Sequence, residues 1–194
     1  SPAMSVSEMK IAVFGGTGFV GYNFLRLCRR ESTAQCLVYT GSPDQLVNLS
    51  RHQVEVQPVD WSQLDKLDLP EQIETIVNFS HPFGKRAGLT AEEQIEKFGA
   101  FVQRNARGRT LRLIQLSSMV VYEPFRAGFE FPEGADLKVP ASDEYASQKV
   151  YLEKAVRSWG VPVANLRPTI VYGPFGVDFT DLFFNGFASG DIEF

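Results

Sequence analysis

The chain is poor in the residues that build metal centres and disulfide frameworks. Among its 194 residues are two cysteines, Cys28 and Cys36, and two histidines, His52 and His81, which lie far apart in the sequence. Two cysteines do not make a framework of cross-links, so we expect reduced thiols and a cytoplasmic location. With so few soft ligands we expect no metal site.

The sequence also lacks an excess of basic charge and a long apolar run. Its net charge is −4 at pH 7, which argues against nucleic acid as a main partner. No segment approaches the roughly 18 apolar residues of a membrane-spanning helix. Ser1–Met4 does not begin a signal peptide, because no basic region leads into an apolar core, and we expect it to be a cloning remnant. Neither a membrane nor nucleic acid is therefore expected as a partner.

What the sequence does contain is an alternation of apolar runs and amphipathic segments, typical of βαβ units. It predicts an α/β fold, a Rossmann-like doubly wound parallel sheet with helices on both faces and a ligand at the carboxyl ends of the strands. The predicted strands are Lys10–Gly15, Gln35–Thr40, Gln53–Pro58, Thr75–Phe79, Thr110–Leu116 and Val161–Leu166, and the predicted helices are Gly18–Arg30, Asp44–Leu49, Ala91–Arg107 and Ser142–Ser158.

A glycine-rich loop joins the first predicted strand to the first predicted helix. Gly15, Gly18 and Gly21 recur every third residue, a spacing found in dinucleotide-binding fingerprints. One glycine permits a sharp turn, one lets backbone N–H groups approach a pyrophosphate, and one lets the helix pack closely on the sheet. The helix N-terminus then favours the anion. A tight turn without a ligand is the alternative interpretation, but the strand before and the helix after favour nucleotide binding.

Two further patterns carry chemical side chains. Tyr145 and Lys149 lie one turn apart on a predicted helix with Ser142 as N-cap, so both leave the same face. An ammonium beside a phenol favours the phenolate and suits a general acid or base, although a surface pair is the alternative. Ser118 ends a predicted strand, where it would hydrogen-bond a substrate oxygen or, alternatively, satisfy loop backbone groups.

Together these segments resemble the extended short-chain dehydrogenase/reductase family, which contains the nucleotide-sugar epimerases and dehydratases. The resemblance runs from Lys10 to about Gly176 and rests on five segments in order: GGTGFVG at 15–21, Val59-Asp60, the SSxxVY pattern at 117–122, YxxxK at 145–149 and RPTIVYGP at 167–174. It implies hydride transfer between the nicotinamide of NAD or NADP and a carbinol or carbonyl of a nucleotide sugar or related small molecule.

The resemblance also implies roles for single residues. Tyr145 would be the catalytic acid/base and would also contact the cofactor, Lys149 would bind the nicotinamide ribose and tune Tyr145, and Ser118 would orient the substrate. Asp60 would hydrogen-bond the adenine, with a helix cap as its alternative role. The remaining cofactor contacts implied are Gly15, Thr17, Gly18, Phe19, Val20 and Gly21 at the pyrophosphate, Phe79 and Ser80 along the ribose and nicotinamide, and Pro168 and Thr169 beside the nicotinamide.

The sequence departs from the family pattern in three places. NAD preference usually shows as an acid at the end of the second strand, but here the strand ends in Thr40-Gly41-Ser42. Thr40 and Ser42 could donate to a 2′-phosphate, so the sequence slightly favours NADP and leaves NAD open. Glu96 stands where the family often has asparagine, if Gly99 is aligned correctly. Met119 and Val120 replace the acids of the 4,6-dehydratases, which disfavours an elimination reaction.

Family members continue into a smaller C-terminal substrate domain. We therefore expect an N-terminal extension at 1–9, a dinucleotide-binding domain at 10–172 and the start of a truncated substrate-binding region at 173–194, in a fragment or a natural short form. An epimerase, reductase or dehydrogenase is favoured over a non-catalytic dinucleotide-binding sensor or structural subunit, because such relatives typically lack YxxxK. By analogy we expect a homodimer through Ala91–Arg107 and Ser142–Ser158.

Overall fold

The computed structural model describes residues 10–31, 34–46, 54–81, 87–122, 131–139, 142–176 and 178–189. These residues form a parallel six-stranded sheet in the order β3-β2-β1-β4-β5-β6. The strands are β1 (Lys10–Phe14), β2 (Gln35–Thr40), β3 (Val54–Pro58), β4 (Ile73–Asn78), β5 (Arg112–Leu116) and β6 (Val163–Leu166). The predicted Rossmann-like α/β fold is confirmed, and each predicted strand is present near its predicted bounds. The predicted N-terminal extension at 1–9 lies outside the described residues.

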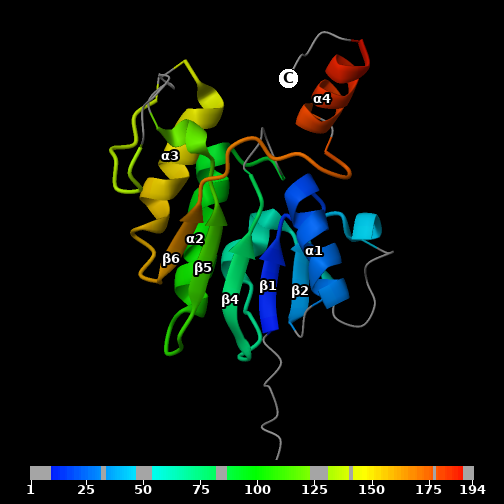
Figure 1. Ribbon diagram of the computed structural model, residues 1–194. Coiled ribbons are helices and arrows are strands. Elements are labelled where there is room, and N and C mark those ends of the chain that lie inside the picture. The colour runs from blue at the N-terminus through cyan, green and yellow to red at the C-terminus, as the bar shows by residue number, and fades with distance from the viewer. Residues whose placement is uncertain are drawn as a thin grey trace, which may run out of the picture.

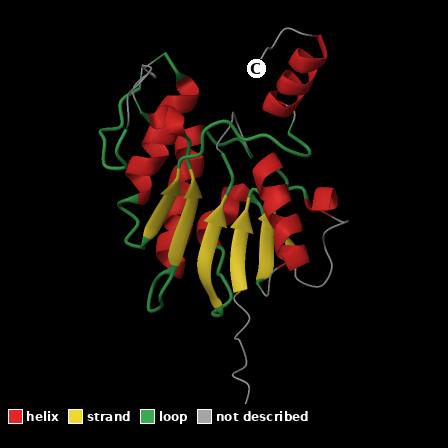
Figure 2. Cartoon of the chain, viewed as in Figure 1, coloured by secondary structure: helices red, strands yellow, loops and turns green. Residues whose placement is uncertain are grey.

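Helices cover both faces of the sheet (Figures 1 and 2). They are α1 (Phe19–Glu31), α2 (Ala91–Asn105), α3 (Glu144–Val156) and α4 (Asp178–Ser189), with 3₁₀ turns η1 (Pro43–Leu46), η2 (Trp61–Lys66) and η3 (Met119–Val121). Leu25 and Cys28 of α1 pack against Ile11 and Val13 on one face, and α2 and α3 cover the other. Alternate residues of β1 serve the two faces because strand side chains alternate with period two.

Three predicted helices are present, and the fourth is corrected. The described part of the predicted helix Asp44–Leu49 belongs to the 3₁₀ turn η1 instead, at whose start the Gln45 N–H donates to the Ser42 carbonyl over 3.3 Å. Residues 47–50 lie outside the described part of the chain. Helix α4 is an addition: it lies in the Phe-rich segment, where the sequence predicts no element.

The predicted N-cap of α3 is wrong by one residue. Asp143, not Ser142, caps the helix: its backbone is extended and its Oδ1 accepts from the Ala146 N–H over 2.9 Å. Because α3 begins at Glu144, the carboxylate of Asp143 lies outside the first turn and faces the N–H groups that the turn leaves unpaired.

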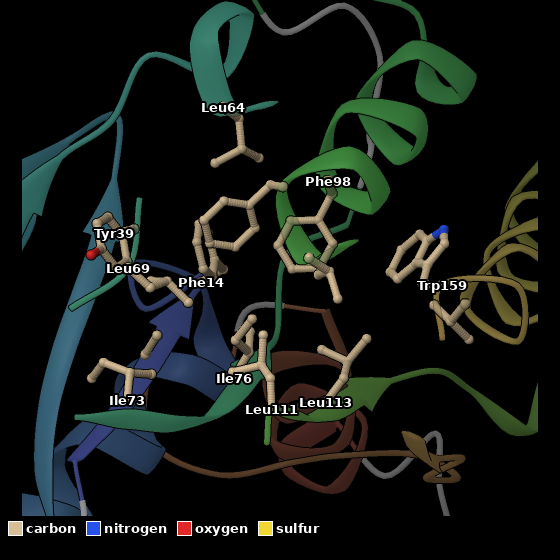
Figure 3. Close-up of a cluster of buried hydrophobic side chains, with 14 of the residues drawn as sticks. Phe14, Tyr39, Leu64, Leu69, Ile73, Ile76, Phe98, Leu111, Leu113 and Trp159 are labelled. Atoms are coloured by element: carbon tan, nitrogen blue, oxygen red, sulfur yellow. The ribbon is translucent and has the colours of Figure 1, made fainter. Parts of the chain in front are cut away.

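Aromatic side chains cluster around Phe14 at the end of β1, and Figure 3 shows Tyr39 and Phe98 on either side of it. Phe14 is fully buried and stacks on Tyr39 with ring centroids 5.1 Å apart, while Phe98 and Phe101 of α2 meet it edge-on at 5.1 and 5.2 Å. Such pairs contribute about 0.5–1.5 kcal/mol each beyond their buried area. The cluster therefore fixes the point from which the glycine-rich loop departs.

All six strands end at one edge, and the chain after β6 runs across that edge toward α1 before entering α4 (Figure 1). Asn23 of α1 holds this crossing segment, since its Nδ2 donates to the Pro174 carbonyl over 2.8 Å. Phe175 adds a ring contact with Tyr22 at 5.2 Å. No helix in the described part of the chain has the length and apolar character to cross a membrane.

Candidate functional site

The three glycines of the loop after β1 differ in what surrounds them. Gly15 has φ +76°, and a Cβ there would lie 2.4 Å from the Ser80 nitrogen. A Cβ on Gly21 would lie 2.3 Å from the Gly15 carbonyl oxygen, whereas one on Gly18 meets nothing nearer than 3.5 Å. The fold itself therefore requires glycine at 15 and 21. At Gly18 the missing side chain leaves open space at the start of α1, where unpaired N–H groups attract an anion.

A cavity of about 510 Å³ opens along the carboxyl ends of the strands. Its volume falls within the range of small-molecule sites, about 300–1,000 Å³. The loops after β1, β2, β3 and β4 all contribute to its walls. Several residues predicted to contact the cofactor line it: Gly15, Thr17, Gly18, Thr40, Ser42, Asp60, Phe79 and Ser80.

The other predicted cofactor residues lie outside this cavity. Phe19, Val20 and Gly21 form the first turn of α1, and Phe19 faces the crossing segment, where a Cβ on Gly176 would lie 2.9 Å from its ring. Pro168 follows β6, and its carbonyl accepts from the Met119 N–H over 3.0 Å, while Thr169 is exposed.

Asp60 takes the capping role that the sequence offers as its alternative. Its Oδ1 accepts from the Ser62 N–H over 2.8 Å at the start of η2. This hydrogen bonding to the Ser62 backbone and side chain lowers the pKa of the carboxyl. Asp60 also lines the cavity, so a contact with adenine stays a prediction.

The end of β2 is arranged differently from the sequence expectation. Thr40 is only 6% exposed, and its Oγ1 accepts from the Ser42 N–H over 3.0 Å. Among the described residues lining the cavity there is no Arg or Lys, and one of them, Asp60, is an acid. A 2′-phosphate would thus find no cationic partner on these walls.

Tyr145 and Lys149 extend from α3 toward the same edge. Lys149 is 3% exposed, its Nζ donates to the Leu116 carbonyl over 3.1 Å, and it lies 5.6 Å from the centre of the Tyr145 ring. Burial lowers the pKa of Lys149 to about 8, against the opposing effect of the Glu153 charge. The alternative of a solvated surface pair is therefore wrong for Lys149. Tyr145 keeps 37% of its surface exposed.

Sequence reasoning missed two residues at this site. His81 lines the cavity and contacts Tyr145, with ring centroids 5.0 Å apart. Its place just after β4, at the carboxyl edge, is the signal that would have identified it. Glu96 stands where the family often has an asparagine, and it is exposed on α2. The amide that α2 turns inward is Gln94, which is 2% exposed and shares a small hollow with His81.

Ser118 caps the short turn after β5. Its Oγ accepts from the Val120 N–H over 3.4 Å, so part of its hydrogen-bonding capacity serves the loop, as the alternative interpretation holds. The hydroxyl hydrogen is not used by this contact, because an oxygen that accepts from the backbone keeps its own O–H to donate.

A buried ion pair ties the surrounding segments together. Arg167 donates from Nε and Nη2 to the two carboxylate oxygens of Glu153 over 2.9 and 2.6 Å, and Glu153 is fully buried. Burial, the largest single effect, raises the pKa of the Glu153 carboxyl, but hydrogen bonds from Arg167 and Ser117 together with the charges of Arg167 and Arg157 outweigh it, and the pKa is lowered. Arg167 also donates from Nη1 to the Tyr122 hydroxyl and to the backbone carbonyl of Glu133.

No group of three or more His, Cys, Asp or Glu side chains that could hold a metal ion occurs among the described residues.

Comparisons with known proteins agree with this geometry. The chain resembles dTDP-glucose 4,6-dehydratase from Bacillus anthracis str. Ames in complex with NAD, with a TM-score of 0.71 and 20% identity over 94% of this chain and 62% of that one. It resembles UDP-glucuronic acid 4-epimerase from Bacillus cereus in complex with UDP-glucuronic acid and NAD, with a TM-score of 0.66 and 17% identity over 86% of this chain and 58% of that one. At such identities the likeness shows the fold.

A third similar structure is the reductase domain of the aureusimine biosynthetic cluster, with a TM-score of 0.63 and 17% identity over 94% of this chain and 55% of that one. The chain thus spans 55–62% of the length of these structures. A comparison with curated protein sequences finds no match. The sequence matches the NAD dependent epimerase/dehydratase family over residues 11–190. The chain therefore belongs to the NAD-dependent epimerase/dehydratase family.

Proposed function

We propose that this chain carries the cofactor site and the acid/base residues of an epimerase, reductase or dehydrogenase acting on a nucleotide sugar or a related carbinol. The observation that carries the proposal is Lys149, a buried ammonium beside the exposed phenol of Tyr145, at the edge where the cavity opens. Burying a lysine costs free energy, because desolvation disfavours the charged ammonium. A lysine buried at this edge of the sheet is therefore a candidate for a functional role. Membership of the family supports an enzyme of this general kind.

The residues of the cavity fit a dinucleotide. Gly18 leaves room at the N-terminus of α1, where a pyrophosphate would accept backbone hydrogen bonds. Asp60 and the end of β2 line the part of the cavity away from α3 and would face the adenosine half. Ser80 and His81 would face the nicotinamide half, since His81 touches Tyr145. When bound, the nicotinamide supplies a carbon that gives or takes a hydride.

The chain's own residues would handle the proton. Tyr145 would take the proton of a substrate hydroxyl at its phenolic oxygen, or return it to a carbonyl oxygen. Lys149, with its pKa near 8, is mostly charged at neutral pH, and its charge would stabilise the negative charge that develops on the phenolic oxygen as the proton moves. Ser118 would donate its hydroxyl hydrogen to the same substrate oxygen and hold it in place, because the bond that its oxygen accepts from the Val120 N–H leaves this hydrogen available.

For the cofactor we propose NAD. The slight preference for NADP drawn from the sequence rested on Thr40 and Ser42 as donors to a 2′-phosphate. Thr40 is only 6% exposed, and the described walls of the cavity carry the acid Asp60 and no Arg or Lys to pair with such a phosphate. The matching family is NAD dependent, and similar structures hold NAD.

The test is turnover by the protein with the dinucleotide and a panel of nucleotide sugars. We expect Tyr145→Phe to lower kcat by about 10²-fold or more, the range for losing a general acid/base, while dinucleotide affinity stays within a few-fold. Turnover that survives this change contradicts the catalytic assignment. Dinucleotide binding with no turnover on any carbinol or carbonyl would instead favour the alternative, a non-catalytic sensor or structural subunit.

A further inference from the structure

A row of buried side-chain amides joins the cavity to the lysine of α3. Asn78, at the end of β4, and Gln115, on β5, are register partners and are 3% and 0% exposed. The Asn78 Nδ2 donates to the Gln115 Oε1 over 2.8 Å, and the Gln115 Nε2 donates to the Leu116 carbonyl over 3.0 Å. At one end Ser80 donates to Asn78, and at the other Lys149 donates to the same Leu116 carbonyl.

The chemistry of the two ends allows one orientation of this row. The Ser80 backbone N–H can only donate, so the atom of Asn78 that faces it over 3.0 Å is the carbonyl Oδ1. The NH₂ group of Asn78 then faces Gln115, whose side-chain carbonyl oxygen must accept from it. The NH₂ group of Gln115 in turn donates to the Leu116 carbonyl, which can only accept. Neither amide can flip without breaking a bond at a backbone end.

This fixed direction sets what the row presents to the site. The Ser80 hydroxyl must give its hydrogen to the Asn78 Oδ1, so it faces the cavity as an acceptor. The Leu116 carbonyl accepts from both Gln115 and Lys149, and this holds the ammonium by one of its three N–H groups.

The presence of two buried side-chain amides in the sheet, where two apolar side chains would also fit, calls for an explanation. A buried amide must keep all its hydrogen bonds, because an unsatisfied one costs about 1–3 kcal/mol, whereas an apolar pair of the same size has no such requirement. We propose that Asn78 and Gln115 are positioning residues that present Ser80 as an acceptor to the dinucleotide and fix the ammonium of Lys149 beside Tyr145. This rests on the proposed function, in which Lys149 and Tyr145 form the acid/base pair.

A pH measurement on Lys149 has to take account of the charged and titratable groups around it among the described residues. Glu153 lies one turn along α3, and its charge favours the ammonium. Arg167 pairs with Glu153, Tyr145 lies across the lysine, and His81 contacts Tyr145. A change at Gln115 leaves all of these groups in place.

The experiment replaces Gln115 by Met, which keeps the volume and removes the amide. The positive end of the amide dipole then no longer faces the Leu116 carbonyl beside the ammonium, and that carbonyl keeps its hydrogen bond from Lys149. Removing this positive end favours the charged lysine, so we expect the pKa of Lys149 to rise by roughly half a unit or more. The pKa is read from the ¹³Cε shift of Lys149 against pH, and kcat is expected to fall about tenfold.

A matched control separates this effect from simple loss of stability. Asn105 is also buried, and its amide likewise bonds backbone groups, accepting from the Leu69 N–H and donating to the Leu67 and Phe101 carbonyls, none of which lines the cavity. Asn105→Leu should lower stability and leave the pKa of Lys149 unchanged. If Gln115→Met folds poorly, the double variant Asn78→Leu with Gln115→Met removes both side-chain partners together and should fold.

The possible outcomes are distinct. A pKa of Lys149 that rises in Gln115→Met but not in Asn105→Leu supports the positioning role. Absence of turnover in the wild-type protein would contradict the proposed function but would leave this support for the positioning role intact. An unchanged pKa and unchanged kcat in Gln115→Met and in the double variant overturn the positioning role, even if the wild-type protein turns over its substrate.

Discussion

At the scale of single residues, the glycine-rich loop separates the needs of the fold from the needs of a ligand. A Cβ at position 21 would collide with the backbone of Gly15, which cannot move without disturbing the turn. A Cβ at position 18 has ordinary contacts and protrudes where a pyrophosphate would bind. The same residue type thus serves packing at one position and close approach of a ligand at another.

This difference gives a prediction for two alanine variants. Gly21→Ala should reduce the free energy of unfolding by about 1–3 kcal/mol, as overpacked sites do, measured by chemical denaturation. Gly18→Ala should unfold at nearly the wild-type denaturant concentration but bind the dinucleotide about tenfold more weakly, measured by calorimetry. Unimpaired binding by Gly18→Ala would contradict the placement of the pyrophosphate at the start of α1.

At the scale of elements, the sequence predicted what depends on local pattern. The apolar runs gave the strands, and the glycine spacing and the Tyr145–Lys149 pair indicated the family. It did not predict η1 in place of a helix, because the turn is packed through Leu46 into the cluster of Leu25 and Val38, residues distant in sequence. It could not show that Lys149 is buried or that Gln115 meets Asn78, because those facts depend on register between strands distant in sequence.

The pair of Arg167 and Glu153 is a second tertiary feature, and it joins α3 to the segment after β6. Arg167→Met would leave the Glu153 carboxylate buried without its partner, so we expect a loss of about 3–5 kcal/mol in the free energy of unfolding at pH 7. The paired carboxyl has a lowered pKa in the folded protein, so the pair stabilises the wild type above the unfolded pKa and this contribution is lost as pH falls.

In Arg167→Met we expect burial to raise the pKa of the Glu153 carboxyl instead, so that the folded state takes up a proton more readily than the unfolded state. The deficit relative to wild type should therefore narrow between pH 7 and pH 4, measured by urea unfolding at each pH. Arg104→Met is the matched control, since Arg104 pairs with Asp68 on the exposed surface and should matter little. A deficit that does not depend on pH would show that lost packing, not the unpaired carboxylate, causes it.

At the scale of the whole molecule, the cavity, α3 and the crossing segment meet at one edge of a sheet, which is where doubly wound folds place their ligands. The chain spans 55–62% of the length of its structural relatives. In the proposed site the dinucleotide contacts residues that follow β1, β2, β3 and β4, and it needs none of the substrate contacts, so its binding can be tested apart from substrate turnover.

We expect NAD to raise the melting temperature more than NADP at equal concentration. A ligand at 100 times its Kd adds about 2.7 kcal/mol, and about 2–4 °C accompanies each kcal/mol in a protein of this size, so saturating NAD should give a rise of about 5–10 °C measured by calorimetry. NADP should give less, because the 2′-phosphate meets Asp60 and no cation among the described cavity residues. Ser42→Arg supplies that cation at the end of β2 and should reverse the order of the two cofactors. A larger rise with NADP in the wild-type protein would contradict the choice of NAD and return Ser42 and Thr40 to the role of phosphate donors.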